Sequence, residues 1–175
     1  MSTTSIGTGE APATWSASLP IHHADDAADH PRSAFLKGLR AAHASGLDLA
    51  EAAEAWTQAV ESEELAEAFA TIQHDAEEMV HRVEYIMAGL RRSPRGGTSW
   101  IARADGAMPG DADCAAAASR ALQRLAQATI EVERLAHDLA EHQAARLLRM
   151  SADEHAASAR RLAAAPAQPI EEQAP

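Results

Sequence analysis

Apolar residues recur at steps of three and four along most of the chain, which predicts long amphipathic helices. Two long helices are predicted over about 31–60 and 63–92, and a third runs from residue 111 or 113 to about 149. A shorter fourth helix is predicted over about 151–165, because Ser151 and Glu154 fit a capping box. The second helix carries the clearest pattern, a seam of alternating four- and three-residue steps typical of a helix packed along a bundle. The seam consists of Leu65, Phe69, Ile72, Ala76, Met79, Val83, Ile86 and Leu90.

A proline- and glycine-rich stretch over 93–110 separates the second helix from the third. At about 3.3 Å per extended residue it is long enough to cross the length of a 30-residue helix. We expect Trp100 and Ile101 to pin this connection to the bundle. One long crossover is the connectivity of ferritin-like bundles. The sequence therefore predicts an all-α, ferritin-like four-helix bundle with three long helices, one short helix and a long crossover.

Both ends of the chain lack a helical pattern. Residues 1–28 are rich in Ser, Thr, Gly, Ala and Pro and are expected to form a disordered arm. Pro166 ends the last helical pattern, so 166–175 is expected to be a disordered tail and 29–165 the bundle domain. Because the fourth helix is predicted to be short, we expect a homo-dimer or higher homo-oligomer to supply the missing packing surface.

Composition narrows the function classes. The chain has 44 alanines, and residues that favour strands are scarce, which argues against sheets. Its 15 Lys and Arg against 26 Asp and Glu give a net charge of −11, so we expect no nucleic-acid partner. No apolar run approaches the roughly 20 residues of a membrane span, and the start resembles no secretory signal. We therefore expect a cytoplasmic protein with no membrane partner. The lone Cys114 fits a small residue at a helix start.

The candidate chemistry lies in histidines and carboxylates at helical spacing. Glu78 and His81 form a Glu-x-x-His pair, the spacing used by carboxylate-bridged di-iron bundles. His74 lies one turn before Glu78 and shares its helix face. The third helix offers Glu133 and His137, four residues apart. These five residues are the predicted metal ligands, and their oxygen and imidazole donors suit iron, with a di-iron centre, manganese and zinc left open.

Each of these signals has a simpler interpretation. Glu78 lies about 200° around the helix from the seam residue Ala76, so the stripe points outward. It is then either a solvated face or one part of a metal site between subunits. Glu133 and His137 also fit an ordinary surface pair. His43 lies on the apolar face of the first helix and is expected to be a hydrogen-bonded core histidine rather than a ligand.

The first two helices resemble a known family. The shared features are a Phe-Leu-x-x-Leu-x-x-Ala-His-Ala start at Phe35, a second helix that opens with Glu-Leu, and its close with Val-x-Arg-Val-Glu and a Gly. These features are similar to stress-associated bacterial ferritin-like bundle proteins of the YciE/YciF type. The resemblance implies a bundle that handles iron. On this register the family's first-helix glutamate falls on Gly46 and its second-helix histidine on Ile72, so the internal ligands are lost.

Two further resemblances concern the site alone. Glu78 and His81 resemble the Glu-x-x-His of encapsulated ferritins, which implies an iron site at a subunit interface. A hemerythrin-like site would draw on His43, His74, Glu78 and His137, but the chain lacks the further His-x-x-x-His that such a site needs.

Two functions follow from these patterns. The first is a ferritin-like, iron-binding bundle that oxidises or holds iron in stress. The second is a metal-free ferritin-like protein with a structural or interaction role, which the losses at Gly46 and Ile72 favour. A third class is a bundle that binds a small molecule through Trp56 and Trp100. No group of polar residues in the sequence supports this class. Whether the protein is an enzyme stays open at this point.

Overall fold

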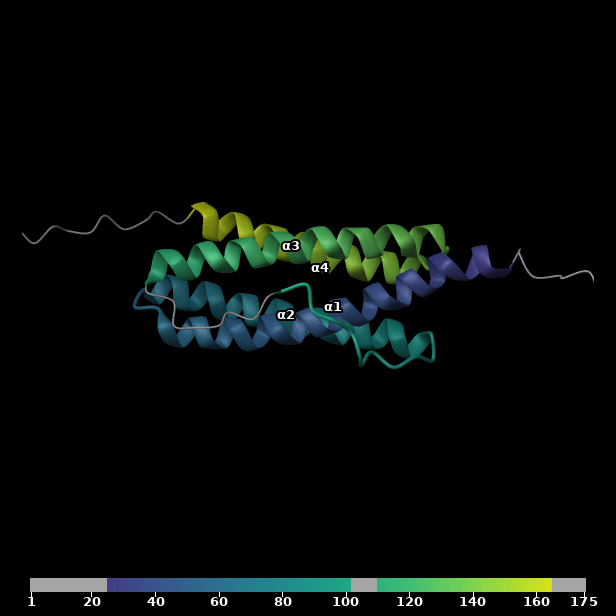
Figure 1. Ribbon diagram of the computed structural model, residues 1–175. Helices are drawn as coiled ribbons and strands as arrows, with labels where there is room; N and C mark the ends of the chain where they lie inside the picture. Colours follow the sequence, from purple (N-terminus) through teal and green to yellow (C-terminus); the bar gives the residue numbers. More distant parts are fainter. Residues whose placement is uncertain (1–24, 102–109, 165–175) are drawn as a thin grey trace, which may run out of the picture.

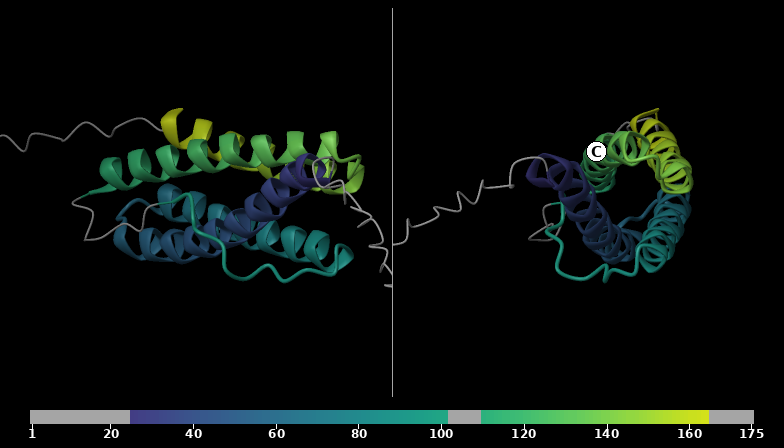
Figure 2. Two further views of the ribbon diagram at one scale, coloured as in Figure 1. Left: turned by 45° about the vertical axis from the view of Figure 1, so that its right-hand side comes forward. Right: turned by 90° about the vertical axis from the view of Figure 1, so that its right-hand side faces the viewer.

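The computed structural model describes residues 25–101 and 110–164, which form four helices (Figure 1). α1 packs against α2 and α3, and α4 packs against α2 and α3. Viewed along the bundle, the helices therefore form a ring in which α2 and α3 occupy opposite corners (Figure 2). The prediction of an all-α four-helix bundle is confirmed. The helices are α1 (Asp25–Ala59), α2 (Glu63–Gly89), α3 (Asp111–Asp138) and α4 (His142–Ala164).

The connection between α2 and α3 crosses the bundle from one end to the other. The Asp111 carboxylate accepts hydrogen bonds from the backbone N–H groups of Glu61 and Ser62, both at 3.0 Å, so α3 begins beside the start of α2. The two helices therefore run parallel. The described part of the connection lies on the outside of α1 (Figure 2). The expected pinning is confirmed, since Trp100 N–H donates to Ser45 Oγ at 2.8 Å and Ile101 is buried.

The core follows the predicted seam. Every seam residue of α2 from Phe69 to Ile86 is buried, and Leu65 and Leu90 pack at its ends. Trp56 of α1 contacts Phe69 of α2 with ring centroids 5.6 Å apart, which closes one end of the bundle. Ser62 caps the start of α2, because its Oγ accepts a hydrogen bond from the backbone N–H of Leu65.

The boundary between the last two helices differs from the prediction. The helix predicted to continue to residue 149 ends at Asp138, and α4 begins at His142. Ala140 adopts a φ of 58°, and the N–H groups of Ala140 and Glu141 bond back to the carbonyls of His137 and Ala136. This is a Schellman motif, which glycine usually supplies. Because an alanine occupies the position, the sequence carries no stop signal there.

The predicted start and length of the fourth helix are therefore wrong. α4 is still the shortest helix, but its 23 residues are close to the 27 of α2 and the 28 of α3. The predicted capping box at Ser151 and Glu154 lies inside α4, where both side chains bond to α2 instead. A dimer is expected from the sequence because the fourth helix is predicted to be short. Since α4 is longer than predicted, this argument for a dimer no longer holds.

The remaining boundaries shift by smaller amounts. α1 begins at Asp25, before the expected start near Pro31, and α2 ends at Gly89 rather than near Arg92. The predicted tail and most of the predicted N-terminal arm lie outside the described residues. No helix in the described ranges is long and apolar enough to cross a membrane.

Candidate functional site

The predicted stripe on α2 faces outward, as expected. His74 and His81 are exposed, and neither makes a polar contact within the described part of the chain. Glu78 is partly buried, and its nearest cationic partner is Arg82 at 3.9 Å. The stripe therefore offers two exposed imidazoles about two turns apart, with the carboxylate of Glu78 between them.

The predicted ligands on α3 form a separate pair. Glu133 contacts His137 at 3.3 Å and Arg149 of α4 at 3.9 Å. Since α2 and α3 occupy opposite corners of the ring, one chain does not bring this pair to the α2 stripe. Among residues 25–101 and 110–164, no three His, Cys, Asp or Glu side chains lie close enough together to hold a metal ion.

The two positions that replace the family's internal ligands are filled by packing. Ile72 is buried in the core. A Cβ added at Gly46 would lie 2.7 Å from Cγ2 of Val80, so α1 and α2 approach too closely there for any side chain. The expected loss of internal ligands is thus accompanied by closure of the space that they would occupy.

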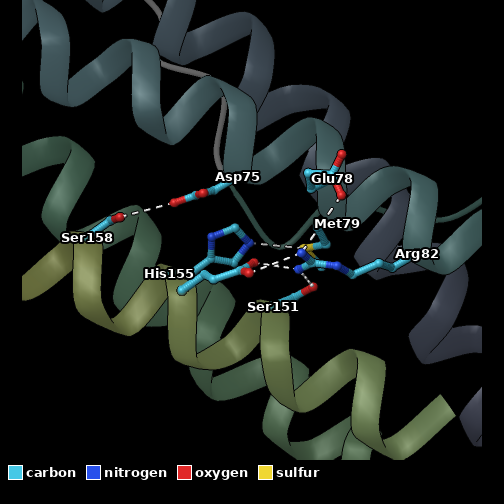
Figure 3. Close-up of polar contacts among 8 residues, drawn as sticks. Asp75, Glu78, Met79, Arg82, Ser151, His155 and Ser158 are labelled. Atoms are coloured by element: carbon cyan, nitrogen blue, oxygen red, sulfur yellow. Dashed lines mark hydrogen bonds and ion pairs between the residues drawn. The ribbon is translucent and has the colours of Figure 1, made fainter. Parts of the chain in front are cut away.

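The polar groups of the bundle meet instead between α2 and α4 (Figure 3). Side chains one turn apart on α2 face side chains one turn apart on α4, and ion pairs and hydrogen bonds join them across the interface. We call this group the α2–α4 polar cluster. It consists of Asp75, Glu78, Met79 and Arg82 on α2, and Ser151, Glu154, His155 and Ser158 on α4.

The Arg82–Glu154 pair supplies most of the charge in the cluster. The guanidinium donates to both carboxylate oxygens of Glu154, with Nη2 at 3.0 Å from Oε1, and Nη1 also donates to Ser151 Oγ at 3.0 Å. The hydrogen bond to Glu154 raises the pKa of Arg82 against the opposing effect of burial. Forked geometry of this kind fixes both side chains as well as their charges.

His155 is the most deeply buried polar side chain of the cluster, with no exposed surface. Its Nε2 lies 3.1 Å from the Sδ of Met79. Nδ1 finds no hydrogen-bond partner among the described residues. Burial lowers the pKa of His155 from 6.5 to about 4, so the imidazole is neutral at neutral pH. Since a thioether only accepts, Nε2 carries the proton and Nδ1 presents its lone pair to the core.

Asp75 lies at the other end of the cluster. Ser158 Oγ donates to its carboxylate at 3.3 Å. Burial, and then the negative charge of Glu154, raise the pKa of Asp75. Protonation of this carboxyl is therefore easier than protonation of an ordinary surface aspartate.

These donors do not fit the di-iron centre that the family resemblance implies. Such a centre needs several ionised carboxylates that are free to bridge two cations. Here Glu154 is bound by Arg82, and Asp75 accepts a hydrogen bond from Ser158. Among the described residues, Nδ1 of His155 is the one buried side-chain nitrogen without a hydrogen-bond partner, and no group of three potential metal ligands includes it. The guanidinium of Arg82 is the positive group that contacts Glu154 in the cluster.

Sequence reasoning missed most of this cluster. The apolar pattern places His155 on a short fourth helix and places Ser151 and Glu154 in its cap, so it predicts no contact of these residues with α2. A usable signal was present, because Asp75, Met79 and Arg82 recur at one-turn spacing just as Ser151, His155 and Ser158 do. Two polar faces of equal period are able to pair.

Two other side chains behave as expected. His43 is buried, and its Nε2 lies 3.1 Å from Glu84 Oε1, which confirms a hydrogen-bonded core histidine. Cys114 is buried near the start of α3, and burial, followed by the charge of Asp111, raises the pKa of its thiol. The thiol is therefore not activated as a nucleophile.

No protein-family model matches the chain, and no curated protein matches it either. Among solved structures, the fold is similar to the X-ray structure of Dps from Thermosynechococcus elongatus, with a TM-score of 0.67 and 10% sequence identity. The match covers 82% of this chain and 99% of that one. The fold is that of a ferritin-like bundle. At this identity the likeness shows the fold alone, and the YciE/YciF resemblance stays a prediction.

Proposed function

We propose that this protein is a ferritin-like bundle that works without an internal metal centre, as a structural or interaction protein. The observation that supports it most is the two-point ion pair between Arg82 and Glu154. In a metal-centred bundle, inward carboxylates are balanced by bound cations. In this chain a built-in guanidinium balances them, so the bundle needs no metal to offset its partly buried negative charge.

The packing of α1 on α2 supports the same proposal. Val80 occupies the space beside Gly46, and Ile72 extends the apolar seam. A ligand restored at either position would displace core atoms rather than reach into an open centre.

Thermal unfolding with and without metal tests the proposal. A ligand that binds only the folded state must raise the melting temperature. We expect the same melting temperature in the presence of a strong chelator, in metal-free buffer, and with added Fe(II) under anaerobic conditions. A melting temperature that rises with iron concentration would count against a metal-free bundle.

The outward stripe supports a second candidate, an iron site between two copies of the chain that oxidises or holds iron in stress. His74, Glu78 and His81 would come from one copy, and Glu133 and His137 from another, because one chain holds the two sets apart. The specific observation in its favour is that the imidazoles of His74 and His81 are exposed and unpaired within the described residues.

A double variant distinguishes the second candidate from the first. Glu78→Ala with His81→Ala should abolish bound iron if the stripe is a ligand set. Glu131→Ala with His142→Ala removes the same two side-chain types from α3 and α4 and serves as the matched control. Iron content that is equal in the two variants rejects the stripe.

We also propose that the protein forms a homo-oligomer in the cytoplasm. In the part of the chain that the structure describes, three large apolar side chains are exposed, namely Leu47, Tyr85 and Met150. Their burial between copies would be favourable. Light scattering during gel filtration tests this, and a monomeric mass across the accessible concentration range rejects it.

A further inference from the structure

A hollow of about 450 Å³ lies on the opposite side of the bundle from the α2–α4 polar cluster, between α1, the connection and α3. This volume is within the roughly 300–1,000 Å³ of small-molecule pockets. Trp100 lines it from the connection, Val132 and Leu135 from α3, and Lys37 and Arg40 from α1. The predicted use of Trp100 in small-molecule binding thus finds a cavity, whereas Trp56 is buried in the core.

Close backbone contacts fix the shape of this hollow. A Cβ added at Gly38 would lie 2.6 Å from Cγ2 of Val132, so α1 and α3 meet closely beneath it. A Cβ at Gly97 would overlap the backbone of Arg40, so the connection lies directly on α1. Trp100 is held by the bond from its backbone N–H to Ser45, which is itself fully buried. The floor and one wall are therefore preformed.

The charge at the hollow opposes the charge of the whole chain. Lys37 is the chain's only lysine, in a protein of net charge −11. Lys37 is exposed and has no ion-pair partner in the described ranges. Arg40 donates from Nε to the Ser93 carbonyl at 3.3 Å, which leaves its terminal nitrogens available. Among the described residues that line the hollow, Glu131 is the only acidic one, so this lining has an excess of positive charge.

From this geometry we infer that the hollow binds a small organic anion with an apolar body. The anionic group pairs with Lys37 and the free nitrogens of Arg40, and the apolar body lies against Trp100, Val132 and Leu135. Such a combination of apolar walls with a few fixed polar groups is the usual composition of a ligand site. The inference is independent of the proposed function, because the hollow shares no residue with the α2–α4 polar cluster or the outward stripe.

A matched pair of fluorescent probes tests the inference on the full chain. Anilinonaphthalene sulfonate carries an apolar body and a negative charge, and phenylnaphthylamine has the same ring system without the charge. We expect saturable binding of the sulfonate at one site per chain. We expect Lys37→Glu to weaken that binding by about fivefold or more while leaving the uncharged probe within about twofold.

Arg160→Glu is the matched control, because it makes the same change of charge on an exposed part of α4. It should change the affinity of the sulfonate by less than about twofold. Equal weakening by the two charge reversals, or no saturable binding by the wild-type chain, overturns the inference. Should Lys37→Glu lose helical signal, Lys37→Gln removes the charge without adding a new one, and it must weaken sulfonate binding alone.

Discussion

At the scale of single residues, the two side chains that matter most to the α2–α4 polar cluster are Arg82 and His155. Helical periodicity predicts which residues face inward on one helix, but not which residue of another helix meets them. The contact of His155 with Met79 joins residues 76 positions apart. Such pairing depends on the register of α2 against α4. The sequence pattern predicts the wrong start for α4, so it does not indicate this register.

His155 makes stability depend on pH. Burial holds its folded-state pKa near 4, below the usual 6.5. Between these values the unfolded chain takes up a proton that the folded chain does not, so stability falls as the pH drops from about 6.5 to about 4. Within this pH range the contribution of His155 to the free energy of unfolding changes by roughly 1.4 kcal/mol per pH unit. Asp75 has the opposite effect on stability. Because its pKa is raised in the folded chain, its protonation favours the folded state as the pH falls.

Urea unfolding at several pH values checks this expectation. In His155→Leu the loss of stability across that window should be clearly smaller than in the wild-type chain. His142→Leu, at an exposed position, is the control and should keep the wild-type dependence. An unchanged slope in His155→Leu contradicts the buried, neutral state of the imidazole.

Arg82 should be more important for stability than an exposed arginine in a similar ion pair. Arg82→Ala leaves the partly buried Glu154 without its partner, which we expect to cost about 1–2 kcal/mol. Arg149→Ala, which breaks the exposed pair with Asp153, should cost less than about 0.5 kcal/mol. Chemical denaturation measures both, and equal effects would remove the special role of the Arg82–Glu154 pair.

At the scale of helices, the seam of α2 and the N-cap at Ser62 were predictable because both depend on local sequence. The helix ends were not. Both α2 and α3 end in Schellman motifs whose left-handed residues are Arg91 and Ala140, with φ values of 54° and 58°. Because neither position is a glycine, the sequence gives no signal for the end of α3. The apolar pattern of α3 continues into α4, so the predicted lengths of these two helices are wrong.

The turn at Ala140 provides a prediction. Ala140→Gly relieves the strain of a positive φ and should stabilise the protein by roughly 1 kcal/mol. The same substitution at the exposed, mid-helix Ala70 should destabilise it by a similar amount. Melting curves of the two variants should therefore shift in opposite directions, and a shared direction contradicts the assigned backbone conformation.

The contact between α1 and α2 at Gly46 provides a further prediction about stability. Because Val80 fills the space of a Cβ, Gly46→Ala should cost about 1–3 kcal/mol through overpacking. Gly89→Ala is the control, since no atom lies within 4 Å of its added Cβ. It should be neutral or stabilising. If Gly46→Ala is as stable as Gly89→Ala, the close approach of α1 and α2 at Gly46 is wrong.

At the scale of the whole molecule, the crossover and the four-helix ring followed from the length of the connection and the number of apolar stripes. What the sequence did not reveal is how charge is balanced inside the ring. Single-helix patterns place His74, Glu78 and His81 on the outside, as the bundle does, but they do not indicate that Glu154 of α4 pairs with Arg82 of α2. The ferritin-like fold thus carries an arginine–carboxylate pair between α2 and α4.

Elemental analysis of the purified protein tests this account most directly. The chain is incubated with Fe(II), Mn(II) or Zn(II), passed through gel filtration, and assayed for bound metal per chain. We predict well below one ion per chain for each metal, with the helical signal and melting temperature of the chelator-treated protein unchanged. One or two tightly bound ions per chain, lost together with thermal stability on chelation, would contradict a metal-free bundle.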